Sequence, residues 1–209
     1  MHPNPIYHTA DAQANIAYAR ERGFGVLAVS DEMGAPLLSH VPFLLSKDGA
    51  TVDLHLVRSN QITRIAKSPR AARIAISGPD GYVSPDWYGL EDQVPTWNYV
   101  AVHLTGTLEM RPQEELRDLL DRESAYFERR LLPKAPWRAD KMEDAALDRM
   151  MRMIVPFRMQ VDAIDGTWKL NQNKPDAARL GAAQHMEAFG IGAETAVLAA
   201  LMRGADGQG

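Results

Sequence analysis

Hydrophobic and polar positions alternate with a period of two along residues 98–105, which is the pattern of a strand with one buried face. One face carries Asn98, Val100, Val102 and Leu104, and the other carries Tyr99, Ala101, His103 and Thr105. Pro95 lacks a backbone donor and disfavours helix at Val94, so a loop or strand edge is expected before the strand. The strand is predicted to run to about Glu109.

Short apolar runs between turn residues predict the other strands. These are Phe24 to Ser30, Leu37 to Leu45, Thr51 to Val57, Arg73 to Ser77, Tyr82 to Ser84 and Ile154 to Val161. Pro36 and Pro42 indicate that the second strand lies at a sheet edge, or that its prolines sit where no ladder donor is needed. Residues 78–81 and 165–166 contain glycine and are predicted to be turns.

Apolar positions at helical spacing, together with helix start and stop signals, predict the helices. These cover residues 11–22, 61–67, 112–130, 141–151, 175–189 and 194–202. A late strand after a helical stretch favours a closed barrel, and the irregular order of strands and helices disfavours a doubly wound α/β sheet. We therefore expect a single mainly-β domain over 1–209, with a helical insertion at 112–151 and a C-terminal helical extension at 175–203.

Composition excludes several classes of protein. The chain has 209 residues and no cysteine, which excludes disulfides, thiolate metal sites and cysteine nucleophiles. A net charge of -4 argues against a protein that coats nucleic acid. The N-terminal residues lack the basic start and apolar core of a signal peptide, and no apolar run approaches the length of a membrane span. We expect a cytoplasmic protein that does not enter a membrane.

One segment of this acidic chain is basic. Residues 54–79 contain no Asp or Glu, but they contain Arg58, Arg64, Lys67, Arg70 and Arg73. Ser59 or Asn60 is expected to cap the short helix that follows, and the unpaired donors at such a helix end favour a phosphate. The cations could equally solubilise the surface and balance the dipole at the end of the helix. No GxGxxG or GxxxxGK[ST] motif is present, so neither a Rossmann turn nor a P-loop is expected.

The segment around residue 97 carries the other candidate chemistry. Trp97, Asn98 and His103 offer a stacking plane and hydrogen-bonding edges to a planar ligand. The alternative is that Trp97 and Tyr99 are core or interface aromatics and that His103 is a histidine satisfied within the sheet. The six histidines show no HExxH or HxxxH spacing, so we expect no metal site. The absence of GxSxG and SxxK leaves hydrolysis unsupported, and the helices are too acidic to form a DNA-recognition pair.

Four segments occur in a specific order and spacing. They are HLVRSNQ (55–61), GYVSPDWY (81–88), VPTWNYVAVHLTG (94–106) and WKLNQNK (168–174). Together they resemble the PaiB-type FMN-binding negative transcriptional regulators over nearly the whole chain. The resemblance implies a split β-barrel of the flavin-reductase and pyridoxamine-phosphate-oxidase kind with flanking helices. It also implies a homodimer with FMN at the subunit interface.

The resemblance further implies where FMN binds. Residues 55–60 and the following helix would hold the phosphate. Oxidase relatives usually have Arg-Lys after the serine, whereas this chain has Asn60 and Gln61, so the phosphate would depend on Ser59, the helix amides and Arg58 or Arg64. The strand that begins near residue 97 would face the isoalloxazine ring. The expected cofactor-binding residues are His55, Arg58, Ser59, Asn60, Arg64, Trp97, Asn98, His103 and Lys169.

Three functions remain open from the sequence. The first is an FMN-binding dimer that represses transcription, with DNA as a partner implied by the resemblance more than by the residues. The second is a flavin- or haem-dependent oxidoreductase, in which the cofactor performs the redox chemistry and the protein positions it. The third is a barrel without a cofactor that binds another protein.

Overall fold

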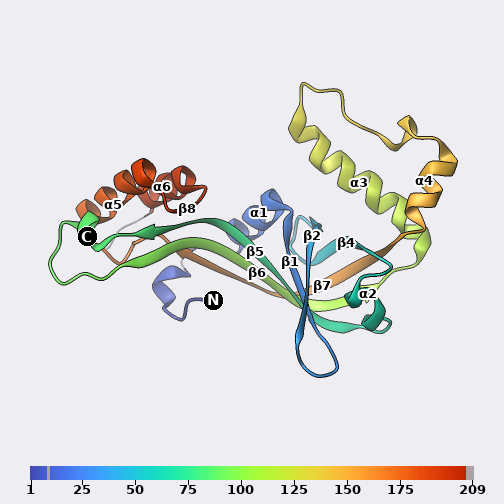
Figure 1. The fold of residues 1–209 in the computed structure, drawn as a ribbon, viewed down its shortest axis with the longest axis horizontal. Coiled ribbons are helices and arrows are strands. Elements are labelled where there is room, and N and C mark those ends of the chain that lie inside the picture. Colours follow the sequence, from blue (N-terminus) through green and yellow to red (C-terminus); the bar gives the residue numbers. More distant parts are fainter. Residues whose placement is uncertain (9, 206–209) are drawn as a thin grey trace. The chain divides into compact units, whose positions relative to one another are not determined.

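A computed structural model describes residues 1–8 and 10–205 of the chain. Its centre is an eight-stranded sheet with the order β2-β1-β5-β6-β7-β4-β3, and β8 pairs with β5 (Figure 1). The strands are β1 (Phe24–Ser30), β2 (Pro36–Pro42), β3 (Leu44–Leu45), β4 (Thr51–Val57), β5 (Arg70–Val83), β6 (Thr96–Met110), β7 (Ile154–Lys169) and β8 (Gly192–Ala193). The pairs β1–β2, β1–β5, β3–β4, β4–β7 and β5–β8 are antiparallel.

The helices follow the order that the sequence predicts. They are α1 (Ala12–Arg22), α2 (Gln61–Ile65), α3 (Leu116–Glu128), α4 (Asp144–Met151), α5 (Asp176–Phe189) and α6 (Thr195–Gly204). Short 3-10 turns lie at Pro5–Tyr7, Pro85–Tyr88, Gln113–Glu115, Arg129–Leu131 and Ala139–Lys141. None of the helices in the described part of the chain is long and apolar enough to cross a membrane.

The sheet curls toward closure. β2 is at one end of the strand order, and it contacts β4, which is next to the other end. Pro36 and Pro42 occupy the two ends of β2, which lies at the end of the strand order, the first of the two alternatives that these prolines allowed. The predicted strand from Leu37 to Leu45 is wrong in one respect, because it is divided at Phe43 into β2 and β3. A curled, mostly antiparallel sheet is the arrangement expected of a barrel.

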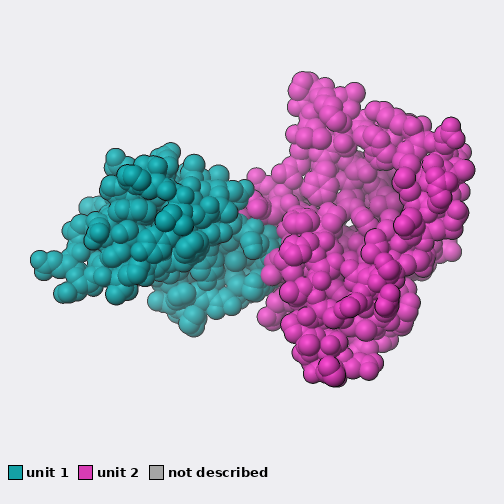
Figure 2. Space-filling view, in the orientation of Figure 1, with its two compact units in different colours: residues 1–15, 76–103, 165–209 teal, residues 16–75, 104–164 magenta. Residues whose placement is uncertain are grey.

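The chain forms two compact units (Figure 2). Unit 1 comprises residues 1–15, 76–103 and 165–209, and unit 2 comprises residues 16–75 and 104–164. In unit 2 the fully buried side chains include Leu54, Ile74 and Phe157 from three strands of the sheet, and Phe43 between β2 and β3. In unit 1 the helices α5 and α6 pack together and bury Met186, Leu198 and Met202.

The predicted alternation along β6 is confirmed. Asn98, Val100, Val102 and Leu104 are buried, and the residues between them are half-buried. The same two-residue period continues to Leu108, beyond the stretch where it was read from the sequence.

The predicted turn at 78–81 is wrong. β5 continues through it to Val83, and Asp80 and Gly81 pair with β8. The separate strands predicted on either side are therefore one strand. A Cβ atom on Gly81 would lie 2.5 Å from Met186 Sδ of α5, so this glycine permits close packing of a helix.

The predicted turn at 165–166 is also wrong. β7 runs without interruption to Lys169, well beyond the end predicted at Val161. A Cβ atom on Gly166 would lie 2.1 Å from the side-chain oxygen of Asn15. As at Gly81, the glycine in the strand reflects a close approach and not a reversal of the chain.

Candidate functional site

The basic segment of residues 54–79, called the cationic segment below, contains a well-defined helix cap that lies in unit 2. Asn60 has an extended backbone, and its Oδ1 accepts a hydrogen bond of 2.8 Å from the backbone nitrogen of Ile62. Its Nδ2 donates to Ser39 Oγ at 3.1 Å, which ties the start of α2 to β2. The predicted cap at Asn60 is confirmed, although α2 ends at Ile65 and is shorter than predicted. Arg64 is exposed in the last turn of α2.

Arg58 is held by uncharged acceptors. Its Nε donates to the backbone oxygen of Arg152 at 2.6 Å, and its Nη2 donates to Gln113 Oε1 at 2.7 Å. Neither acceptor neutralises the guanidinium, so Arg58 keeps a net positive charge at an exposed position. Ser59, between Arg58 and the cap, is also exposed.

The cations of this segment lack carboxylate partners. Within residues 1–8 and 10–205, no Asp or Glu lies at ion-pair distance from Arg58, Arg64, Lys67, Arg70 or Arg73. In contrast, Arg117 and Arg122 of α3 each pair with an Asp one turn away. The segment is therefore a local source of positive potential in a protein whose net charge is negative.

His55 lies on β4 and faces α3. Its Nδ1 is 3.2 Å from Glu123 Oε2, which is an ion-pair distance. The two atoms do not have the geometry of a hydrogen bond, because His55 Nδ1 is without a hydrogen-bond partner among the described residues. His55 thus contacts α3 of the helical insertion. It lies in unit 2, as Arg58 does.

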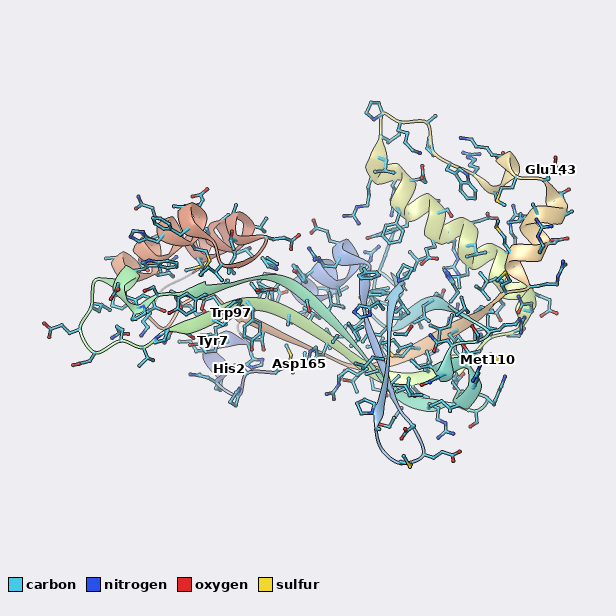
Figure 3. The ribbon with its side chains drawn as sticks, in the orientation of Figure 1. His2, Tyr7, Trp97, Met110, Glu143 and Asp165 are labelled. Carbon is cyan, nitrogen blue, oxygen red and sulfur yellow. The ribbon has the colours of Figure 1, made fainter. Side chains whose placement is uncertain are left out.

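In unit 1, Trp97 presents a partly exposed indole. The residue is 42% exposed, and its Nε1 donates to Asp80 Oδ1 at 3.0 Å. The ring of Tyr82 meets it edge-on, with the ring centroids 6.4 Å apart. Figure 3 shows Trp97, Tyr7 and His2 in the same part of unit 1. The hydrogen bond fixes the ring while leaving apolar area open to solvent.

Lys169 lies beside Trp97. Its Nζ donates to Thr96 Oγ1 and, at 2.9 Å, to the backbone oxygen of Trp97. It also lies 5.9 Å from the centroid of the Tyr7 ring. Burial lowers the pKa of the Lys169 ammonium from its ordinary value, because none of these neutral contacts compensates for lost solvation as a carboxylate would.

Asn98 and His103 lie on opposite faces of β6. Asn98 is fully buried, and its Nδ2 lies 3.5 Å from the sulfur of Met202 on α6. Its Oδ1 has no hydrogen-bond partner among the described residues. His103 is half-buried on the other face, as the alternation predicts.

The structure divides the expected residues between the two units. Unit 2 contains His55, Arg58, Ser59, Asn60 and Arg64, and unit 1 contains Trp97, Asn98, His103 and Lys169. The sequence did not indicate that Tyr7, Asp80 and Thr96 surround Trp97 and Lys169. Tyr7 is 162 positions from Lys169 in the chain and carries no motif. Among the described residues, no group of three or more His, Asp or Glu could hold a metal ion.

The fold defines a class of protein. The structure matches that of the FAD and heme binding protein from Mycobacterium smegmatis with a TM-score of 0.54 and 15% identity, covering 88% of this chain and 80% of that one. It also matches a "putative 5-nitroimidazole antibiotic resistance protein" from Bacteroides thetaiotaomicron with a TM-score of 0.51 and 17% identity, covering 75% and 82%. The chain shares the fold of these proteins, a split β-barrel with flanking helices, and the predicted fold class is confirmed.

The family follows from the sequence match. Residues 1–163 match the family model described as "Putative FMN-binding domain", and the chain belongs to this family. It is 28% identical over 189 residues to "Protease synthase and sporulation protein PAI 2" of Bacillus subtilis, covering 90% of this chain and 89% of that protein. The predicted membership of the PaiB-type family is confirmed.

Proposed function

We propose that this protein binds FMN and that its exposed cationic segment receives the phosphate. The observation that carries the proposal is the absence of a carboxylate partner for Arg58 and Arg64 within the described part of the chain. A phosphate dianion supplies the missing negative charge. Charge-assisted hydrogen bonds to phosphate are stronger than neutral ones. Membership of an FMN-binding family supports the same ligand.

The residues present fit a phosphate. The guanidinium of Arg58 is already oriented by Gln113 and the carbonyl of Arg152, so little side-chain entropy remains to be lost on binding. Ser59 adds an exposed hydroxyl donor beside it. Separately, in unit 1, the fixed and partly exposed indole of Trp97 offers apolar area that a flat ring system could contact. When bound, the isoalloxazine ring would supply redox chemistry that no side chain provides.

The proposed biological role is negative regulation of transcription by a homodimer with FMN at the subunit interface. The PaiB-type family membership supports this role. Light scattering would measure the mass of the assembly with and without FMN. A mobility-shift assay on the promoter of the protein's own gene, repeated at increasing salt, tests DNA contact because phosphate contacts weaken steeply with salt.

Replacing Arg64 by alanine tests the phosphate site. Arg64→Ala is expected to weaken FMN binding by about ten- to hundredfold, because a hydrogen bond to a charged group is worth about 1.5–3 kcal/mol. Riboflavin binding should stay unchanged, since riboflavin has no phosphate. Quenching of flavin fluorescence on titration with protein measures both affinities.

The matched control for Arg64 is Arg149→Ala. Arg149 is exposed in the last turn of α4 and lies outside the cationic segment, so the variant loses the same charge elsewhere on unit 2. Equal loss of FMN and riboflavin affinity in Arg64→Ala would place Arg64 outside the phosphate site. If the unaltered protein bound neither flavin, the result would favour the third function, a barrel without a cofactor that binds another protein.

A flavin-dependent oxidoreductase is the second candidate. The contacts of Lys169 favour it, because a partly buried ammonium without a carboxylate partner among the described residues could stabilise negative charge on an adjacent flavin ring. NADH oxidation by the FMN-loaded protein tests this function. Lys169→Met should slow that reaction while leaving the circular dichroism spectrum unchanged. No turnover of NADH above that of free FMN would count against it.

A further inference from the structure

Unit 2 contains a cavity of about 420 Å³ outside the cationic segment of α2. It lies between the end of α1, the β3–β4 hairpin and α3. Its lining residues are Arg20, Leu44, Leu45, Ser46, Lys47, Thr51, Asp53, Arg122, Ala125, Tyr126 and Arg129. The volume is within the range of about 300–1,000 Å³ that small-molecule sites occupy. No lining residue belongs to the predicted flavin site.

The lining is strongly cationic. It contains four cations, Arg20, Lys47, Arg122 and Arg129, and a single carboxylate, Asp53. The carboxylate of Asp53 is already shared by two arginines, since Arg158 donates to both of its oxygens at 2.6 and 3.1 Å and Arg122 donates at 3.0 Å. Asp53 therefore cannot neutralise the other cations of the cavity.

Three of these cations have no acidic partner. In residues 1–8 and 10–205, no carboxylate lies at ion-pair distance from Arg20, Lys47 or Arg129. Three unneutralised cations around one cavity repel one another. Binding of an anion would lower this repulsive free energy.

Two of the cations are held in place before any ligand arrives. Arg20 Nε donates to the backbone oxygen of Leu45 at 3.2 Å, and the hydroxyl of Tyr126 donates to the backbone oxygen of Arg20. The guanidinium of Arg129 lies over the ring of Tyr126, 4.8 Å from its centroid. These contacts orient the cations at little further entropic cost, which favours binding.

The lining also has an apolar part, beside the hydroxyl groups of Ser46, Thr51 and Tyr126. Leu44, Leu45 and Ala125 contribute hydrocarbon surface beside the cations. A second cavity of about 440 Å³ shares Ala125 and Arg129 and adds Pro136 and Trp137. Inorganic phosphate would leave this apolar surface uncovered, whereas an organic phosphate would cover it.

We propose that this cavity binds a small organic phosphate, with the phosphate among Arg20, Lys47 and Arg129 and the organic group against Leu44, Leu45 and Ala125. The ligand would join α1, the β3–β4 hairpin and α3. Binding would therefore stabilise the packing of the helical insertion on the sheet. The inference is independent of flavin binding, because neither the cavity nor its charge depends on FMN.

Calorimetric titration of the whole 209-residue chain with phenyl phosphate, in the presence of saturating FMN, tests the proposal. Phenol and inorganic phosphate serve as the two halves of the probe. Phenyl phosphate is expected to bind at least tenfold more tightly than either half. Lys47→Ala/Arg129→Gln should weaken it by about tenfold or more, because two charge-assisted contacts are lost. Arg149→Gln, a matched exposed arginine outside the cavity, should bind phenyl phosphate as the unaltered protein does.

Three results would overturn the proposal. The first is unchanged phenyl phosphate binding by Lys47→Ala/Arg129→Gln when its thermal unfolding matches that of the unaltered protein. The second is equal affinity for phenyl phosphate and inorganic phosphate, which would leave the apolar surface without a role. The third is binding of phenyl phosphate only when FMN is left out, which would place the probe at the flavin site. Failure of FMN itself to bind would leave the calorimetric test intact.

Discussion

Asp53 illustrates how one residue joins three elements. It lies on β4 directly opposite Arg158 of β7, and Arg122 reaches the same carboxylate from α3. Burial by itself raises the pKa of Asp53, but the hydrogen bonds and charges of Arg158 and Arg122 outweigh it and hold the pKa below the usual value of 3.8. The ionised carboxylate therefore stabilises the attachment of α3 to the sheet.

Asp53→Asn is expected to lower the free energy of unfolding at neutral pH by about 2 kcal/mol, because Arg158 loses its anionic partner and Arg122 keeps only Asp118. The partial exposure of both guanidinium groups keeps the loss below that of a fully buried pair. Urea unfolding measures the change. Asp121→Asn removes the exposed partner of Arg117 and should cost only about 0.5 kcal/mol.

The pH dependence of stability in the unaltered protein and in Asp53→Asn tests the lowered pKa of Asp53. A carboxyl with a depressed folded-state pKa contributes stability above the unfolded value of 3.8, and this contribution is lost as the pH falls through the folded-state pKa. The stability difference between the unaltered protein and Asp53→Asn should therefore shrink as the solution is acidified below that value. A difference that stays constant to the lowest pH at which the protein is folded would contradict this origin.

Local residue signals predicted part of the candidate site. The cap at Asn60 and the surrounding cations lie within one short stretch, so residue type and spacing were sufficient. The environment of Lys169 could not be predicted in this way, because Tyr7 and Thr96 reach it from distant parts of the chain. Likewise, nothing in the sequence pairs His55 with Glu123 of the helical insertion.

At the scale of elements, strands bounded by loops were predicted well, including the long strand β6, and the two strands that contain glycine at a predicted turn were not. β1 and β4 match the predicted limits, since charged or turn residues surround their apolar runs. β5 and β7 were predicted too short because glycine was interpreted as a turn signal. In both strands the glycine accommodates a neighbouring side chain, and this requirement is a tertiary one. Periodicity therefore gave the strand faces, while strand ends depended on packing.

Gly166→Ala tests that explanation. The added methyl group would overlap the side-chain oxygen of Asn15, which accepts a hydrogen bond of 2.9 Å from Trp168 Nε1. We expect a loss of about 1–3 kcal/mol in the free energy of unfolding, as for other overpacked sites. Thermal and urea unfolding would measure it.

A double-mutant cycle with Asn15→Ala isolates the overlap. In the Asn15→Ala background, Gly166→Ala should cost much less, because the obstructing amide is gone. Gly204→Ala is the control for the substitution itself, since no heavy atom lies within 4 Å of the added methyl group. Additive costs of Gly166→Ala and Asn15→Ala would show that the strand requires glycine for another reason.

For the whole molecule, three strands pass from one unit into the other. Three of the four boundaries between the units fall inside β5, β6 and β7, and the fourth, between Asn15 and Ile16, falls inside α1. Hydrogen-bonded strands that continue through a boundary couple the stability of its two sides, in contrast to domains joined by a flexible linker. We expect a single cooperative transition in scanning calorimetry, with equal calorimetric and van't Hoff enthalpies. Two resolved transitions would show that the units unfold independently.

The course of the chain through unit 1 limits how the protein can be dissected. This unit is assembled from the first 15 residues, a middle segment and the last 45 residues, so no single truncation yields it intact. A fragment that ends after residue 163, where the family match stops, lacks α5, α6 and the end of β7. Expression of that fragment would leave β5 and β6 without their covering helices and expose apolar surface. Domain swaps with relatives should therefore exchange the chain as a whole.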